Sequence, residues 1–434
     1  MSFAALADEI LLKILSLCDV YTVLAISAIN KRLRCITFDK QLWLILLRDD
    51  TFRETLELHP LGHKELENHS TEELVGLVKC AVAGPPRWWL AGPSSYSQPA
   101  HRIGFGVDLE RYQDPCLLPG TRYMMLRGRV GDGLYMYEVR TSRRVWEYDA
   151  NFFTTWAVDL APGSPTARVV LLERSPDRTA YNISVEEINL AEGVSREVFF
   201  LEFGTKSRSL STIVGDFLLL PPTRIIGAKA KLLLVNWRSS TYVPLDYGTS
   251  VNSTVELISG YLVVTYPDRM PPYQQHLSVI NLDAFSQHMR PLTAASLSDE
   301  IPHSPVPIAA DETLEYNGRP VGDFTVLVKL SALASALHRG AYNIVVYAGE
   351  IPQQPSLVAQ MGHLLTEGRL PPAAVARPAL LSFKFTPPLS PGRPCGLRLV
   401  SALRAAPGFG TARLSPRGAL LRRALGSVVV SYYQ

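Results

Sequence analysis

Two histidines have the spacing of a metal-binding pair, and they are the first residues to consider for chemistry. Two imidazoles can share a metal ion when they lie one helical turn apart, and His59 and His63 are four residues apart. Pro60 and Gly62 lie between them, however, and interrupt any helix that would place both rings on one face. We therefore interpret the pair as part of a solvent-exposed loop, and the sequence predicts neither a metal site nor a cofactor.

Acidic residues occur in adjacent pairs, at Glu186-Glu187, Asp299-Glu300 and Asp311-Glu312. Adjacent residues of a strand point to opposite faces of a sheet, and adjacent residues of a loop point to water, so neither arrangement suits acid–base catalysis. The phosphate-binding G-x-x-x-x-G-K-S/T, the nucleophile G-x-S-x-G and the zinc-binding H-E-x-x-H motifs do not occur. The sequence predicts a protein that is not an enzyme, and a catalytic site inside the C-terminal domain is the least favoured alternative.

Arginine is concentrated towards the C-terminus. Residues 360–434 hold nine Arg and one Lys against Glu367, a local charge of +9, whereas the rest of the chain carries −6. Arg422 and Arg423 precede the last apolar run, where we expect a loop, and arginine forks bind acidic or phosphorylated protein segments well. We take these two as candidate substrate-binding residues. Few aromatic residues lie among the arginines to stack on bases, which disfavours nucleic acid, and a solvated arginine-rich surface accounts for the composition equally well.

The first 48 residues have the pattern of short amphipathic helices. Asp19 and Asp39 can each accept backbone N–H bonds at the start of a helix, and Asn30 with its basic neighbours closes the middle one. Leucine and isoleucine recur at helical spacing throughout. So small a unit cannot bury all of these side chains within itself, and we expect the surplus to bind a partner.

This segment resembles the F-box, the module by which substrate receptors of cullin-RING ubiquitin ligases bind a Skp-type adaptor. The matching positions are Leu6 with Glu9, Ile10 and Leu11, then Ile14-Leu15 with Cys18-Asp19, then Leu24, Asn30-Lys31-Arg32-Leu33 and Leu42-Trp43. The family usually has Leu-Pro where this chain has Leu6-Ala7. The adaptor-binding residues that the resemblance implies are Leu6, Ile10, Leu11, Ile14, Leu15, Leu24, Ile26, Leu33, Leu42 and Trp43. The alternative is a helical cap that keeps these side chains in its own core.

A charged connector and one further helix follow. Ser70 and Glu73 form a capping box that predicts a helix over 71–83, and Gly84-Pro85-Pro86 ends it. The predicted organisation is an F-box at residues 1–48, a linker with a helix at 49–89, and a substrate-binding domain at 90–434.

From residue 90 the pattern changes to short strands separated by Gly, Pro, Asp and Ser. A turn followed by an apolar run recurs at Gly131-Asp132-Gly133-Leu134, Val214-Gly215-Asp216-Phe217, Ser259-Gly260-Tyr261-Leu262 and Val321-Gly322-Asp323-Phe324. Gly131 and Gly215 are 84 residues apart, twice 42, and Gly215 and Gly260 are 45 apart. Four short strands per unit of roughly 42 residues are typical of a β-propeller.

The fold class predicted is therefore α plus all-β, a helical F-box and linker helix followed by a β-propeller. Its 345 residues allow seven or eight blades, and insertions at 291–310 and 350–378 favour seven. Residues 232–247 and 259–266 are similar to the degenerate propellers of fungal F-box proteins. The apolar run at 428–433 predicts a last strand that closes the ring beside the first. A pair of β-sandwiches is the structural alternative.

Composition restricts the compartment. Five cysteines lie far apart without a C-x-x-C pair, which is typical of a reducing environment. No basic leader precedes the first apolar run, and no uncharged apolar stretch reaches about 18 residues, so we expect no membrane association and a cytoplasmic or nuclear location.

The predicted function is that of a substrate-recognition subunit of an SCF-type ubiquitin ligase. The predicted partners are a Skp-type adaptor, through it a cullin, and a protein substrate that the sequence does not name. The alternative is an F-box or propeller scaffold that works outside the ligase.

Overall fold

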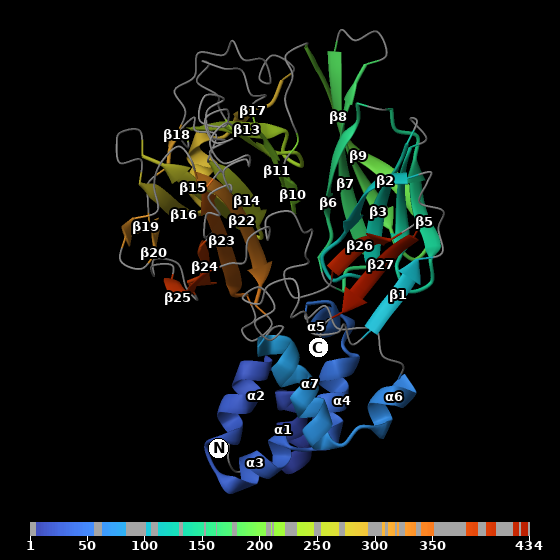
Figure 1. Cartoon of the computed structure of the whole chain (residues 1–434), viewed down its shortest axis with the longest axis vertical. Helices are drawn as coiled ribbons and strands as arrows, with labels where there is room; N and C mark the ends of the chain where they lie inside the picture. The colour runs from blue at the N-terminus through green and yellow to red at the C-terminus, as the bar shows by residue number, and fades with distance from the viewer. Residues whose placement is uncertain are drawn as a thin grey trace, which may run out of the picture.

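The computed structural model describes residues 6–432 except 56–62, 84–100, 106–111, 130–132, 152, 162, 176–179, 205–209, 211, 222–231, 247–252, 269–273, 294–305, 309–310, 317–318, 321–325, 336–339, 351–378, 389–395, 405–419 and 425–426. A bundle of helices lies at one end, and antiparallel sheets in two groups occupy the rest (Figure 1). The coarse prediction of N-terminal helices followed by β-structure is confirmed.

The helices begin where the sequence supplies caps. Their bounds are α1 Asp8–Leu15, α2 Val20–Ser27, α3 Lys31–Thr37, α4 Lys40–Arg48, α5 Asp50–Thr55, α6 His63–Asn68 and α7 Thr71–Ala83. The Asp19 carboxylate accepts the N–H of Thr22 at 2.7 Å, and that of Asp39 accepts the N–H of Gln41 at 2.7 Å, as predicted. Asn30 was predicted to end the second helix, but it begins the third. Its side chain caps α3 by accepting the N–H of Leu33 at 2.9 Å.

The predicted capping box is also present. The N–H of Ser70 donates to the Glu73 carboxylate at 2.6 Å, and the N–H of Glu73 donates to the Ser70 hydroxyl at 3.2 Å. Helix α7 starts here, and its Leu74, Val75 and Val78 are buried in the same core as residues of α1–α4. The core of the helical unit therefore continues past residue 48.

Five of the sheets run in chain order. Sheet 1 has β2 Tyr112–Leu117, β3 Tyr123–Gly128, β4 Leu134–Glu138 and β5 Arg143–Tyr148, and sheet 2 has β6 Thr155–Asp159, β7 Thr166–Arg174, β8 Ala180–Asn189 and β9 Val194–Gly204. Sheet 3 has β10 Thr212–Val214, β11 Phe217–Leu220, β12 Leu232–Asn236 and β13 Thr241–Asp246, with β17 Arg290–Pro291 and β18 Val306–Pro307 beside β13. Sheet 4 has β14 Thr254–Ile258, β15 Tyr261–Pro267, β16 Gln275–Asn281 and β19 Glu312–Thr313. Sheet 5 has β22 Val326–Ala334, β23 Tyr342–Glu350, β24 Ala379–Thr386 and β25 Gly396–Arg404. A 3₁₀ helix (Leu282–His288) follows β16, and β20 Glu315–Tyr316 with β21 Arg319–Pro320 forms a two-stranded ribbon.

Successive sheets share their cores, because the middle strands are apolar on both faces. Val169 and Leu171 of β7 pack against sheet 1, whereas the intervening Val170 packs against sheet 3. In β12, Val235 faces sheet 2 and Leu234 faces sheet 4. Alternation along the middle strands thus joins sheets 2 and 3 each to the sheet before it and the sheet after it.

The two ends of the β-region pair with each other. Sheet 6 consists of β26 Leu420–Ala424, β27 Ser427–Tyr432 and β1 His101–Phe105. Strand β27 lies between the other two, and its Tyr432 pairs with His101 of β1. Strand β26 also contacts β2 of sheet 1. The predicted pairing of the last strand with the start of the domain is confirmed.

The predicted turn repeat does not fall at the same place in every sheet. Gly215 and Gly260, with φ of +59° and +77°, each join the first two strands of a sheet, as a shared repeat requires. Gly133, by contrast, precedes β4, the third strand of sheet 1. The first strands of sheets 1–4 start at Tyr112, Thr155, Thr212 and Thr254, so the true intervals are 43, 57 and 42 residues.

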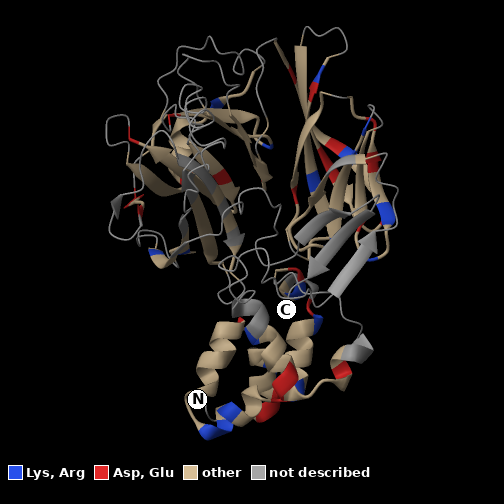
Figure 2. Cartoon of the chain, viewed as in Figure 1, with Lys and Arg blue, Asp and Glu red and all other residues tan. Residues whose placement is uncertain are grey.

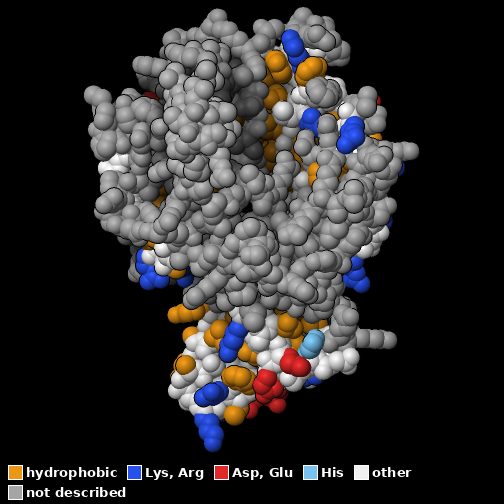
Figure 3. All heavy atoms as spheres, viewed as in Figure 1, with side chains coloured by type: hydrophobic (Ala, Val, Ile, Leu, Met, Phe, Trp, Pro, Cys, Tyr) orange, Lys and Arg blue, Asp and Glu red, His pale blue; other side chains and the backbone are white. Residues whose placement is uncertain are grey.

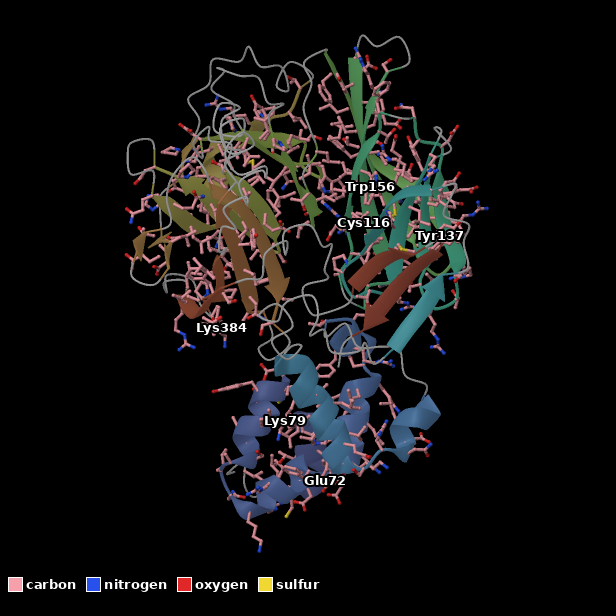
Figure 4. All side chains as sticks on the ribbon, viewed as in Figure 1. Glu72, Lys79, Cys116, Tyr137, Trp156 and Lys384 are labelled. Carbon is pink, nitrogen blue, oxygen red and sulfur yellow. The ribbon has the colours of Figure 1, made fainter. Side chains whose placement is uncertain are left out.

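Helix α5 attaches the helical unit to the sheets. The Glu54 carboxylate accepts the N–H of Gly163 at 2.6 Å and forms an ion pair with Arg122 at 3.3 Å. Gly120 (φ +84°) permits this approach, because a Cβ there would lie 3.0 Å from the Cβ of Glu54. Lys384 of β24 lies at the end of sheet 5 that faces the helices (Figure 4). Burial and then the charge of Arg398 lower the pKa of Lys384, and Asp19 between α1 and α2 acts in the opposite direction.

We expect the pairing at the chain ends to be required for stability. Removing residues 427–434 leaves β1 and β26 without their common neighbour and exposes unpaired backbone. The truncated chain should aggregate or lose its cooperative unfolding in calorimetry and light scattering. Removing only 433–434, which lie beyond β27, is the control. A full truncation that melts like the intact chain would show that this pairing contributes little.

Glu54→Ala should loosen the helical unit from the sheets. The change removes a charged acceptor that is only 12% exposed, and we expect a loss of about 1–2 kcal/mol of stability with faster amide exchange at Gly163. Glu67→Ala is the matched control, because the Glu67–Arg48 pair is exposed and such pairs contribute roughly 0–1 kcal/mol. Equal effects of the two substitutions would contradict the proposed attachment.

Candidate docking surface of the N-terminal helices

Helix α1 has two apolar faces with different surroundings. Leu11 and Leu15 are completely buried in the core of the helical unit. Ile10 of α1 and Leu17, two residues past its end, are 52% and 71% exposed, and the partly buried Ile14 lies between them in the sequence. Ile10, Ile14 and Leu17 do not belong to the described core of the helical unit.

Helix α2 repeats this arrangement. Val20 and Val23 are buried, whereas Tyr21 at the start of the helix and Ile29 just past its end are 53% and 66% exposed. Figure 3 shows hydrophobic side chains on the surface of the helical unit in this view. We define the docking surface as Ile10, Ile14, Leu17, Tyr21 and Ile29.

Only part of the predicted adaptor-binding set lies at the surface. Five of its members have 3% exposure or less and belong to the core, namely Leu11, Leu15, Leu33, Leu42 and Trp43. Leu6, Leu24 and Ile26 are partly buried and pack against that core, and only Ile10 and Ile14 of the ten are in the docking surface. These five are buried in a core that α6 and α7 complete from beyond residue 48, so the first 48 residues alone do not form it.

Three exposed residues were missed by the sequence analysis, Leu17, Tyr21 and Ile29. Ile10, Ile14, Leu17 and Tyr21 follow one another at intervals of four, three and four, which is the signal that could have identified them. The capped break at Asp19 obscures it, because it separates the run into two helices.

Charged residues surround this surface. Arg32 of α3 donates to Asp8 at 2.5 Å and to the carbonyl of Leu6 at 2.6 Å, and so ties the start of α1 to α3. Lys13, Lys31 and Arg34 are exposed, and basic residues gather at the α3 end of the unit (Figure 2). A partner with an acidic rim around an apolar centre would complement this arrangement.

Cys18 adjoins the docking surface, but its thiol is not activated. Burial, and to a smaller extent the neighbouring Asp19, raises the pKa of the Cys18 thiol, and the thiol donates to the carbonyl of Ile14 at 3.3 Å. A protonated thiol is a weak nucleophile. The surface is therefore suited to binding and not to covalent chemistry.

The second predicted site is placed differently from the prediction. Arg422 and Arg423 do not lie in a loop, because both belong to β26, where they pair with Val429 and Val428 of β27. Their side chains lie outside the described structure. Among the described residues, no group of three or more His, Cys, Asp or Glu is arranged to hold a metal ion, and no helix is long and apolar enough to cross a membrane.

Comparisons with known proteins do not identify the chain. No protein-family model matches the sequence, and no curated protein matches it. Among solved structures, the Malassezia sympodialis allergen Mala s 1 is 8% identical with a TM-score of 0.37 and covers 76% of this chain and 95% of its own. The WD40 domain of SCAP from fission yeast (10%, TM-score 0.32, 74% and 75%) and an oligogalacturonate lyase in complex with manganese (10%, 0.30, 68% and 76%) are also similar. At these TM-scores the similarities carry no argument about this chain.

The two faces of α1 should respond differently to charge. Leu15→Asp puts a carboxylate into an apolar core, which costs several kcal/mol, so amide protection should be lost across α1–α4. Leu17→Asp alters a side chain that is 71% exposed and should change stability by roughly 0.5 kcal/mol or less. Hydrogen exchange of both variants gives the comparison. Loss of protection in both would mean that Leu17 is part of the core.

Proposed function

We propose that this chain is the substrate-recognition subunit of an SCF-type cullin-RING ubiquitin ligase. In this proposal the docking surface binds a Skp-type adaptor, the adaptor binds a cullin, and the β-region binds a protein substrate. The chain itself supplies binding surfaces, and the other subunits supply catalysis. The cytoplasmic and nuclear location expected from the sequence belongs to the same proposal.

The observation that carries the proposal is the exposed apolar surface of α1 and α2. The helical unit has a core of its own, so Ile10, Leu17, Tyr21 and Ile29 are not needed to complete it. Contiguous patches of exposed apolar side chains are typical of protein-binding sites, and these four residues lie on and beside two successive helices. Burying one of them contributes roughly 1.5–3 kcal/mol, so four can supply much of the affinity of a stable complex.

The resemblance of the sequence to the F-box, with its motif residues in the same order, supports a Skp-type adaptor as the partner. Its motif positions divide between core and surface, with Leu11, Leu15 and Trp43 supporting the helices. Ile10 and Ile14 contribute to the docking surface itself. A motif that specifies both the fold and the binding face of a module is expected to contain some core residues and some surface residues.

We also propose that the sheets are blades of a β-propeller. Residues of five sheets in chain order line one cavity of about 240 Å³, mainly through the first strands β6, β10, β14 and β22. Sheets that share flanking cores and meet through their first strands support a radial arrangement. The described part of the chain has six sheets of three or more strands, so the proposal takes six blades in place of the seven favoured by sequence spacing.

The alternative function is an interaction scaffold that uses the same helices outside a ligase. Adaptor binding would be common to both functions, and only the ligase subunit requires a cullin in the same complex. Purification of the intact chain with its partners distinguishes them by the presence or absence of the cullin.

Ile10→Asp combined with Leu17→Asp should abolish adaptor binding. The double variant removes two apolar side chains and places two charges in a dry interface, so we expect affinity to fall by a factor of about 100 or more. Calorimetry with purified Skp-type adaptor measures the change. Ile45→Asp is the matched control, because Ile45 is 51% exposed on α4, outside the docking surface.

The adaptor should bind the Ile45→Asp variant like the unaltered chain, and all variants should keep the same circular dichroism. Undiminished binding by the double variant, or equal losses in the double variant and the control, would sink the F-box assignment.

A further inference from the structure

One cavity joins the helical unit to the sheets. Glu54 and Thr55 of α5 and the turn at Pro119-Gly120 of sheet 1 contribute to its wall. Four first strands complete it with residues 158–160, 212–214, 256–257 and 332 with 334. Its volume of about 240 Å³ is below the roughly 300–1,000 Å³ of common small-molecule pockets. It therefore suits a group the size of one side chain.

Three carboxylates line this cavity, and two of them have partners. Asp159 accepts the N–H of Gly215 at 2.8 Å and pairs with Arg168 at 3.5 Å. Glu54 is held by Gly163 and Arg122. No Lys, Arg or His is among the described lining residues. The wall is therefore negative on balance.

Glu256 of β14 is the third carboxylate, and it has no hydrogen-bond or ion-pair partner among the described residues. It pairs in the sheet with Val263 of β15, and the lining residues of β22 that share its cavity are Ala332 and Ala334. Loss of water in these apolar surroundings raises the pKa of Glu256 to about 7. The other ionisable groups on the cavity wall are Glu54 and Asp159, and neither can neutralise it.

We propose that the cavity binds a guanidinium or ammonium group, with Glu256 as the carboxylate that pairs with it. An unpartnered carboxylate in a cavity is stabilised by a cation that brings its own hydrogen-bond donors. A metal ion is not suited, because the described acidic residues are not arranged as a ligand group. Small alanine side chains from β22 leave the room that a planar or tetrahedral cation needs. The proposal is independent of adaptor docking.

Methylguanidinium and methylurea are suitable probes, because they have the same shape and differ in charge. Calorimetry on the full chain should show binding of methylguanidinium and none of methylurea. Because Glu256 must be ionised to pair, affinity should fall by about 30-fold from pH 8 to pH 5.5, given a pKa of about 7. This pH profile needs no variant. Binding of methylurea, or a flat profile, would overturn the proposal.

Glu256→Gln should reduce methylguanidinium affinity by at least tenfold and remove its pH dependence. The variant should fold, since it replaces a desolvated carboxylate with a neutral group of similar size. Glu312→Gln is the matched control, because Glu312 is exposed on β19 of the same sheet. It should bind methylguanidinium like the unaltered chain. Unchanged binding by Glu256→Gln would refute the assignment.

Arginine acetylated at its amino group and amidated at its carboxyl group tests whether the cation is a protein side chain or a small free molecule. If it binds with the same Glu256 dependence, the cavity receives a side chain of a bound protein. If only methylguanidinium binds, the natural occupant is a small free cation. Adaptor affinity measured on the same Glu256→Gln variant should be unchanged, so failure of this proposal and failure of the adaptor proposal give different results.

Discussion

The fold of the β-region depends on strands that must be covered on both sides. In β7 and β12, consecutive residues are apolar, and alternation sends them into two different cores. A sheet of this kind has no face that can be left to water, so each sheet requires a neighbour before and after it. The order of the sheets in space therefore follows the order in the chain. Strand β26 of sheet 6, made from the two ends of the β-region, contacts β2 of sheet 1.

The helical unit differs from the sheets, because it buries some of its apolar side chains in a core and leaves others exposed. Its core is completed by α6 and α7, which lie far beyond the motif that resembles the F-box. The docking surface can then be altered without loss of the fold, and it can bind a partner without unfolding. The Glu54 carboxylate connects the helical unit to the sheets by accepting the N–H of Gly163, and Gly120 leaves room for it. This contact holds the docking surface in a defined orientation relative to the sheets.

Much of the local structure could be predicted from sequence, and most of the site could not. Caps at Asp19, Asp39 and Ser70 were found because a cap is determined by a few adjacent residues. Ile10 and Leu11 look alike in sequence, and only packing decides which of them is buried. The strand that contains Arg422 was predicted to be a loop because the adjacent arginines directly precede the last apolar run, whereas they pair with that run as β26. The cavity could not be predicted, because its wall combines residues 54 to 334 through tertiary contacts alone.

The pairing of β1 with β27 has a consequence for the order of events during synthesis. Strand β1 (His101–Phe105) leaves the ribosome long before its partner β27 (Ser427–Tyr432) is made. At about 5–20 residues per second, roughly 20–70 s pass between completion of α7 and synthesis of β27. All core residues of the helical unit have been made by then, whereas β1 still lacks its partner strand. A chaperone that covers β1, or an early partner on the helices, would act within this interval.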